Sequence, residues 1–213
     1  AYGQPMVISE GNLQIDGGYY CNMIDSFSSS GSTRGAAILI DGGTAVINGG
    51  RYAGTACGIA VRNDAQLTVN NGYIGSLDTG LYIGDNASAV IHDGEFDRYE
   101  KTSSSSKSQN CAVMMNSTGD LTIYGGSFYG AKQGLFLQSA GQVTIWNGSF
   151  KSRNPREAQQ GAMVISDMEN MNITVYNGTF SGTAGIRSNV KFPLKDILPD
   201  KNSNGMRATG NGV

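Results

Sequence analysis

The 213-residue sequence is poor in charged side chains and carries no excess of positive charge. Charged residues make up 15% of the chain, against a usual share of about 25%, and the net charge is −2. This balance, without a basic stretch, argues against general nucleic-acid binding. No apolar run reaches the roughly 18 to 20 residues that a membrane-spanning helix needs, so we expect no membrane-spanning segment.

Cysteine and histidine are also scarce. The three cysteines, Cys21, Cys57 and Cys111, are odd in number and scattered, which excludes a disulfide scaffold. His92 is the only histidine and no C-x-x-C pair occurs, so we expect no metal site and no cofactor. Cys57 and Cys111 occupy equivalent positions of the repeat described below. We expect both to point inward as free thiols, two repeats apart and too distant for a disulfide.

Glycine, by contrast, is abundant. The chain contains 31 glycines, about twice the usual share, and 39% hydrophobic residues, which is enough to bury a core and excludes a disordered chain. The glycines do not recur at every third position, so collagen is excluded. The composition therefore favours a glycine-punctuated β protein. Because the sequence starts at Ala1 without an initiator methionine, we interpret it as a mature fragment or a piece of a longer protein.

An internal repeat organises the chain. Its clearest copies share the pattern apolar-Thr-apolar-aromatic-x-Gly-Ser/Thr-Phe and lie at 121–128, 143–150 and 173–180. Weaker copies lie at 13–20, 45–52, 67–74 and 89–96. The glycine of the second turn position recurs at spacings of 32, 22, 22, 32, 22 and 30 residues, which gives a base period of 22 with three insertions. Those glycines are Gly18, Gly50, Gly72, Gly94, Gly126, Gly148 and Gly178.

Each period contains three short strands, of which 80–83, 143–145 and 126–128 are examples of the first, second and third. Such strands are too short to be stable alone, but stacked repeats pair each strand in parallel with its equivalent, at about 4.8 Å per rung. We therefore predict an all-β, single-stranded right-handed parallel β-helix of about seven 22-residue coils. It spans residues 1–187, and residues 188–213 form a non-repetitive C-terminal cap or linker. Three inward ladders are expected: Ile59, Leu81, Val113 and Leu135; Val69, Ile91, Ile123 and Ile145; Phe96, Phe128, Phe150 and Phe180.

The signature [VL]-T-[IV]-x-[GN]-G-[ST]-F resembles the repeat of the right-handed β-helix of the pectate-lyase-like superfamily. The glycine-rich copies are most similar to repeats in large surface or secreted proteins of gut bacteria. The resemblance covers about residues 5–187 and implies the same fold, together with a secreted or cell-surface location in a bacterium. That superfamily includes lyases, hydrolases, tailspikes and non-catalytic adhesins, so the resemblance leaves the activity open.

The residues expected of an enzyme with this fold are missing. Glycosidases of the family share Asp-Asp, Asn-Thr-Asp, Gly-His-Gly and Arg-Ile-Lys strings, and none of these occurs here. Asp64, Asp85 and Asp167 fall near the corner after the first strand, where turns require polar residues, so we interpret them as structural. We assign no catalytic residue and expect a non-catalytic extracellular or cell-surface module that binds glycan or presents a rigid adhesive or structural surface.

A column of outward residues follows the last apolar residue of the second strand. His92, Tyr124, Trp146 and Tyr176 occupy its last four coils, and we predict that they bind a polysaccharide or a surface-protein partner. Two alternatives remain open. The segment 192–199 can fold back over the aromatic side chains, or the rings can stack for stability alone. The complete column reads Asp16, Asn48, Asn70, His92, Tyr124, Trp146 and Tyr176.

The three insertions, at about 22–34, 97–110 and 151–160, fall at the same point of the coil, after the third strand. Insertions on one side of a solenoid commonly build its binding face. Their charged residues can contact an anionic glycan or a partner protein, or can simply keep the surface soluble. An alternative function, a polysaccharide lyase or glycoside hydrolase with diverged catalytic residues, would use Asp97, Glu100, Arg153 and Arg156. The candidate residues of this face are Asp97, Arg98, Tyr99, Glu100, Arg153 and Arg156.

After Ile186 the 22-residue pattern is expected to stop without an eighth copy. A β-helix that ended there would expose open strand edges and an apolar cross-section, which favour end-to-end association. Solenoids therefore carry atypical capping segments. We predict that the tail buries its apolar side chains against the last coils, between the prolines Pro193 and Pro199, which cannot donate to a ladder. These side chains are Phe192, Leu194, Ile197 and Leu198.

Overall fold

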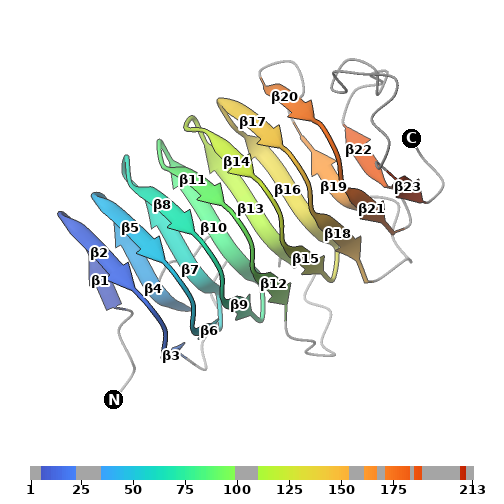
Figure 1. Ribbon diagram of the computed structural model, residues 1–213. Coiled ribbons are helices and arrows are strands. Elements are labelled where there is room, and N and C mark those ends of the chain that lie inside the picture. Colours follow the sequence, from blue (N-terminus) through green and yellow to red (C-terminus); the bar gives the residue numbers. More distant parts are fainter. Residues whose placement is uncertain are drawn as a thin grey trace.

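The computed structural model describes residues 6–22, 35–98, 110–153, 161–166, 171–182, 185–188 and 207–209. Every helix or strand assigned in this part of the chain is a strand, numbered β1 to β23. The strands form three parallel sheets that wind around a common core (Figure 1). The described residues therefore form a right-handed parallel β-helix of about seven three-stranded coils, and the prediction of this fold is confirmed.

The three sheets, here called A, B and C, each take one strand from every coil. Sheet A contains β1 (Met6–Ile8), β4 (Ala36–Asp41), β7 (Cys57–Arg62), β10 (Thr79–Asp85), β13 (Cys111–Ser117), β16 (Gln133–Ser139), β19 (Gly161–Ile165) and β22 (Ile186–Ser188). Sheet B contains β2 (Asn12–Ile15), β5 (Thr44–Ile47), β8 (Gln66–Val69), β11 (Ser88–Ile91), β14 (Leu121–Ile123), β17 (Gln142–Ile145) and β20 (Asn172–Val175). Sheet C contains β3 (Tyr19–Asn22), β6 (Arg51–Gly54), β9 (Tyr73–Ser76), β12 (Glu95–Arg98), β15 (Ser127–Gly130), β18 (Ser149–Ser152), β21 (Thr179–Ser181) and β23 (Arg207–Thr209).

The three predicted inward ladders are present. In sheet A, Leu81 pairs with Ile59 on one side and with Val113 on the other. The phenylalanine ladder of sheet C is fully buried, and its rings stack with centroids 4.6 to 4.9 Å apart. Because equivalent side chains lie directly above one another, a single repeat pattern fills the whole core. The remaining pairings agree with the predicted ladders of all three sheets.

The glycine of the second turn position is required by the backbone between sheets B and C. All seven of these glycines have φ between 103° and 152°, a region that side chains other than glycine rarely adopt. In four coils the preceding Asn or Asp accepts a hydrogen bond from the glycine N–H at 2.7 to 2.9 Å. Each glycine carbonyl from Gly18 to Gly148 accepts an N–H from the next coil, so the turns continue the ladder.

The corner between sheets C and A explains why the first strand opens with glycine. A β-carbon on Gly58 would lie 2.8 Å from the Ile74 side chain, inside the core, so Gly58 points inward. Cys57, one residue earlier, consequently packs outside the main core in a second cluster with Ala36, Leu39, Ala56 and Ala60. The prediction that Cys57 points into the core is therefore wrong, although Cys57 and Cys111 are both buried free thiols. In sheet A, Thr79 of β10 pairs with Cys57 on one neighbouring strand and with Cys111 on the other.

The ladder continues past Ile186. Strand β22 (Ile186–Ser188) pairs with β19, and β23 (Arg207–Thr209) pairs with β21. Sheets A and C therefore each have an eighth strand, although the repeat signature has no eighth copy in the sequence. The eighth strands satisfy backbone groups that would otherwise form open edges. Residues 192–198, for which we predicted burial, lie outside the described residues.

Candidate functional site

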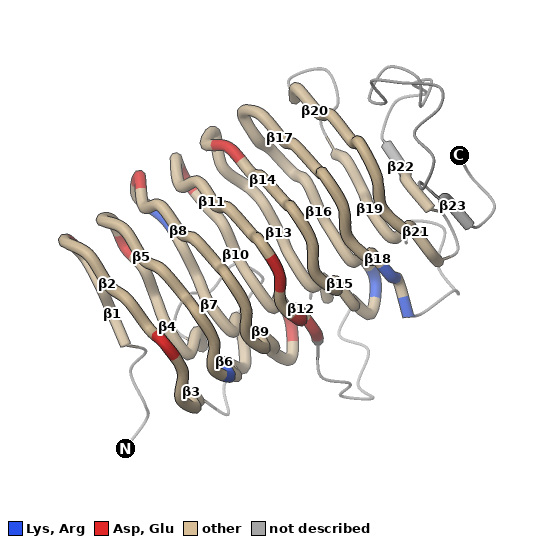
Figure 2. Tube along the Cα trace, viewed as in Figure 1, with Lys and Arg blue, Asp and Glu red and all other residues tan. Residues whose placement is uncertain are grey.

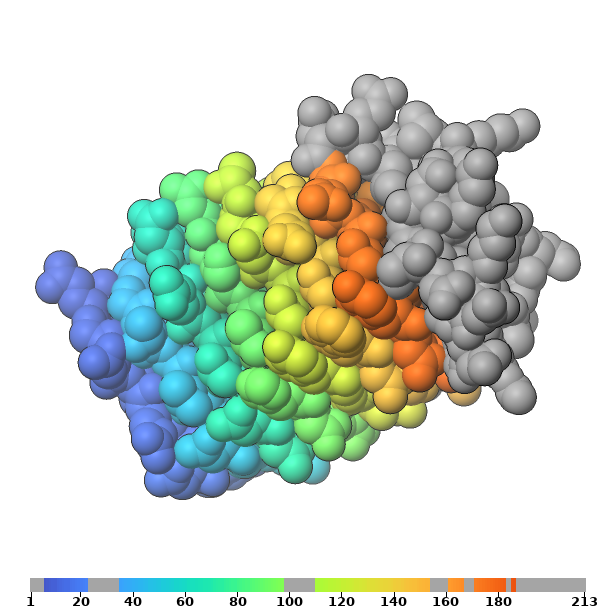
Figure 3. Space-filling view, turned by 45° about the horizontal axis from the view of Figure 1, so that its top comes forward, coloured from blue at the N-terminus to red at the C-terminus, as the bar shows by residue number. Residues whose placement is uncertain are grey.

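The outward column at the end of sheet B forms one continuous line along the rod. We call its members, Asp16, Asn48, Asn70, His92, Tyr124, Trp146 and Tyr176, the outer column. From Asn48 onward, each backbone N–H of the column donates to a carbonyl of the preceding coil at 2.7 to 2.8 Å. The backbone therefore fixes one column residue on each coil. In Figure 1 the strands of sheet B lie side by side in coil order, and in Figure 3 the coils form successive bands along the rod.

The first three coils of the outer column form a hydrogen-bonded amide ladder. Asn70 Nδ2 donates to Asn48 Oδ1 at 2.7 Å, and Asn48 Nδ2 donates to Asp16 Oδ1 at 2.6 Å. Gln14 Nε2 donates to the same carboxylate oxygen at 2.8 Å. The hydrogen bonds from Asn48 and then Gln14 lower the pKa of Asp16 below its ordinary value. This end of the column therefore presents amide groups and an ionised carboxylate to solvent.

The next four coils of the outer column form an aromatic stack. The ring centroids of His92 and Tyr124 lie 4.9 Å apart, those of Tyr124 and Trp146 6.3 Å, and those of Trp146 and Tyr176 4.1 Å. The ring planes of each pair are parallel within 4°. Tyr124, Trp146 and Tyr176 are 47%, 44% and 36% exposed. The predicted glycan-binding residues are thus brought together in one solvent-facing stack.

A second row of outward side chains runs beside the outer column on sheet B. It consists of the residues two positions earlier in each coil, which share the outward face because strand side chains alternate. The last three coils place Thr122, Thr144 and Thr174 in register, each half-buried. We call these three residues the threonine row. Each threonine therefore lies on the same outward face as the aromatic residue two positions later in its coil.

The outward face of sheet B carries almost no charge. No Lys or Arg occupies its outward positions in β2, β5, β8, β11, β14, β17 and β20, or the outer column that follows these strands. Three carboxylates border the face: Asp16 in the outer column, Asp93 immediately after His92, and Asp120 immediately before β14. Asp120 Oδ1 accepts a hydrogen bond from the backbone N–H of Gln142 at 2.8 Å. Most of the charged residues lie elsewhere on the rod (Figure 2).

The structure brings together two of the predicted insertion-face residues. Arg153 Nη2 lies 2.9 Å from Asp97 Oδ2, and the guanidinium lies 5.7 Å from the centre of the Tyr129 ring. Asp97 belongs to β12 and Arg153 follows β18, so this ion pair links coils along the outer side of sheet C. The Asp97 side chain is 12% exposed. Arg98 ends β12, and nothing is described of its side chain. Tyr99, Glu100 and Arg156 lie outside the described residues.

Two of the corner aspartates have the structural role that the sequence predicts. Asp64 has a φ of 62° and Asp85 a φ of 57°, in the left-handed region that turn-forming Asp tolerates. Asp167 lies outside the described residues. Within the described ranges, no group of three or more His, Cys, Asp or Glu side chains is arranged to hold a metal ion. The same ranges contain no helix of the length and apolarity that a membrane crossing requires.

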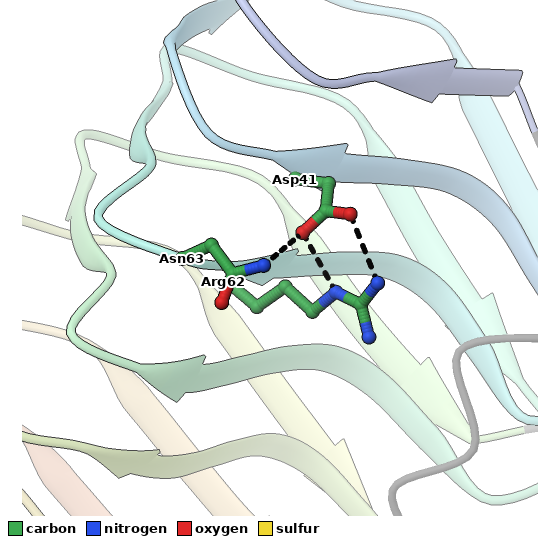
Figure 4. Close-up of polar contacts among 3 residues, drawn as sticks. All are labelled: Asp41, Arg62 and Asn63. Atoms are coloured by element: carbon green, nitrogen blue, oxygen red, sulfur yellow. Dashed lines mark hydrogen bonds and ion pairs between the residues drawn. The ribbon is translucent and has the colours of Figure 1, made fainter.

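Sheet A also carries a charged cluster that the repeat pattern did not predict (Figure 4). The Arg62 guanidinium donates to both oxygens of Asp41, at 2.8 and 2.9 Å, and Asn63 Nδ2 donates to Asp41 Oδ1. The hydrogen bond from Arg62 lowers the pKa of Asp41 and raises that of Arg62. The cluster joins neighbouring coils. Aligning the last residues of β4 and β7 would have revealed it, because these two residues pair in register.

The fold defines the chain as a solenoid protein of the parallel β-helix class. No protein-family model matches the chain, and searches of curated proteins and of solved structures find no similar protein. What the outer column can bind must therefore be inferred from its own geometry.

Proposed function

We propose that this chain is a non-catalytic β-helix module of a secreted or cell-surface bacterial protein, and that the outward face of sheet B binds carbohydrate. The observation that carries the proposal is the exposed stack of Tyr124, Trp146 and Tyr176 on consecutive coils. Tyrosine and tryptophan combine an apolar ring with a polar group, and they are enriched where proteins bind ligands. The 22-residue signature supports membership of the pectate-lyase-like superfamily and, through it, the proposed location.

The rigidity of the stack supports binding over a purely structural role. Each ring is attached to a residue whose backbone N–H is bonded to the preceding coil, and each ring is held parallel to its neighbours. A surface ordered in this way loses little conformational entropy when a ligand binds. Exposed cross-strand pairs contribute only about 0.2–1 kcal/mol to stability. The stabilisation gained by stacking is therefore small compared with the buried phenylalanine ladder.

The proposal is tested with a glycan array followed by calorimetric titration of the best ligand. The wild type and the Trp146→Ala variant are compared with Tyr19→Ala, which removes an aromatic ring that is 65% exposed on sheet C. We expect Trp146→Ala to weaken binding at least tenfold, about 1.4 kcal/mol, and Tyr19→Ala to bind like the wild type. If the wild type binds no polysaccharide, the module is a structural spacer and the proposal is rejected.

The alternative function, a lyase or hydrolase with diverged residues, has narrower support. Of its four expected residues, only Asp97 and Arg153 are described, and they form an ion pair with each other. Incubation with uronate-containing polysaccharides, with and without calcium, decides between the functions. Release of unsaturated products would overturn the non-catalytic proposal.

A further inference from the structure

We infer that the ligand of sheet B is an uncharged, extended polysaccharide that lies along the rod axis and is contacted once per coil. This inference rests on the proposed carbohydrate-binding function and specifies its ligand class. It follows from three properties of the described face: the orientation of the stacked rings, the second row of hydroxyl groups, and the distribution of charge.

The ring orientation decides which atoms a ligand can reach. Because the rings stack face to face along the coils, Tyr124 and Trp146 each have a neighbour on both sides. A sugar ring therefore cannot lie flat on either of these two residues. What the stack presents to solvent is a line of ring edges, and these edges include the phenol hydroxyls and the indole N–H. Such a line binds by hydrogen bonds that repeat from coil to coil, which suits a hydroxyl-rich polymer better than a single sugar.

The threonine row gives each coil a second contact of the same kind. Thr122, Thr144 and Thr174 share the outward face with the aromatic residues of the outer column, so one hydroxyl-bearing residue and one aromatic residue recur on each of these coils. Rungs are about 4.8 Å apart. A chain of hydroxyl-bearing sugar residues that lies along the rod can donate to and accept from one rung after another. A peptide strand advances by only about 3.3 Å per residue, so its successive residues do not match successive rungs one to one.

The charge of the face excludes anionic chains. Its outward positions hold no Lys or Arg, whereas Asp16 and Asp120 are carboxylates. Recognition of uronate or sulfate groups normally uses Arg or Lys, because cations offset the cost of removing an anion from water. A uronate polymer on this face would find no cation and would meet like charge. An uncharged chain has neither disadvantage.

The test is calorimetric titration with neutral oligosaccharide series derived from cellulose, xylan and mannan, from the monosaccharide to the hexasaccharide. Oligogalacturonates of matched length serve as the anionic series. We expect the affinity for at least one neutral series to rise at least tenfold between the disaccharide and the tetrasaccharide, because the stack spans four coils. Matched oligogalacturonates are expected to bind at least tenfold more weakly. Thr144→Val is expected to reduce affinity three- to tenfold, and Thr179→Val, on sheet C, to have no effect.

The outcomes separate this inference from the proposed function. Equal affinity for the disaccharide and the hexasaccharide, or tight binding of oligogalacturonates, would overturn the inference and leave carbohydrate binding intact. Absence of binding to every neutral and anionic chain would reject the proposed function itself. Because Thr144→Val preserves side-chain volume, its melting temperature shows whether a loss of affinity comes from the missing hydroxyl or from altered folding.

Discussion

At the scale of single residues, burial decides what an aromatic stack does. Phe128 and Phe150 stack with centroids 4.6 Å apart and are both fully buried. Trp146 and Tyr176 stack just as closely, at 4.1 Å, but remain 44% and 36% exposed. Hydrophobic stabilisation is proportional to the apolar area removed from water, so the inner stack contributes far more to folding. The outer stack leaves part of each ring available for a ligand.

This difference predicts unequal effects on stability. Phe128→Ala is expected to destabilise the fold by about 3–5 kcal/mol, because it removes a buried ring and leaves a cavity. Trp146→Ala is expected to cost less, about 1–3 kcal/mol, because Trp146 stacks on both Tyr124 and Tyr176 and each aromatic pair contributes about 0.5–1.5 kcal/mol. Urea unfolding followed by circular dichroism measures both. A loss for Trp146→Ala as large as that for Phe128→Ala would show that the outer column is a stability element.

At the scale of strands and corners, polar side chains connect one coil to the next. Asp41 at the end of β4 accepts two hydrogen bonds from Arg62 at the end of β7. The Asp97–Arg153 pair joins β12 to the residue after β18 and so spans three coils of sheet C. Both pairs are partly exposed, so each contributes at most about 1 kcal/mol. They add lateral links to a structure whose main stability comes from its stacked core.

The Asp41 pair predicts a specific dependence on pH. Hydrogen bonding to Arg62 lowers the pKa of Asp41 below its ordinary value of 3.8, so the folded state favours the ionised form. The stabilisation is therefore complete above the ordinary value and is lost as the pH falls through the folded-state pKa. Asp41→Asn is expected to lower the melting temperature slightly at about pH 7 and by less at about pH 2.5. A melting-temperature difference that stays the same at both pH values would contradict this account.

At the scale of the whole molecule, each sheet of the rod ends in an edge strand whose backbone N–H and C=O groups have no strand to pair with on one side. The eighth strands, β22 and β23, extend sheets A and C beyond the seventh coil. Strand β23 pairs with β21 although 25 residues separate the two strands in the sequence. Part of the C-terminal segment therefore caps the ladder of sheet C. Without that cap, β21 would present an unpaired strand edge.

Deleting residues 188–213 is expected to lower the melting temperature by several degrees and to produce end-to-end oligomers. Thermal melting and sedimentation measure the two effects. Ala208→Pro is a milder variant, because it removes one N–H from β23 at the position that pairs with Phe180. It is expected to shift both measurements in the same direction by a smaller amount. A truncated chain that stays monomeric with an unchanged melting temperature would show that the segment is only a linker.

Much of the fold and the membership of the outer column could be predicted from the sequence, because a coil repeats its environment every 22 residues. Val69, Ile91 and Ile123 share one sheet position simply because they share one repeat position. The same alignment placed Tyr124, Trp146 and Tyr176 on consecutive coils of one outward face. The alternation of strand side chains then assigned each ladder to the core or to solvent.

Only the tertiary structure decided how side chains of different repeat positions meet. Cys57 lies outside the core because Gly58 takes the inward position at a tight corner, which simple alternation does not predict. The pairing of Asp97 with Arg153 depends on side-chain directions and on the spacing of three coils. The edge-on presentation of the aromatic rings follows from the rotamers that packing selects. The period and the ladders can be predicted from the sequence because they repeat along one dimension. The corners, ion pairs and ring orientations depend on the three-dimensional packing of neighbouring coils.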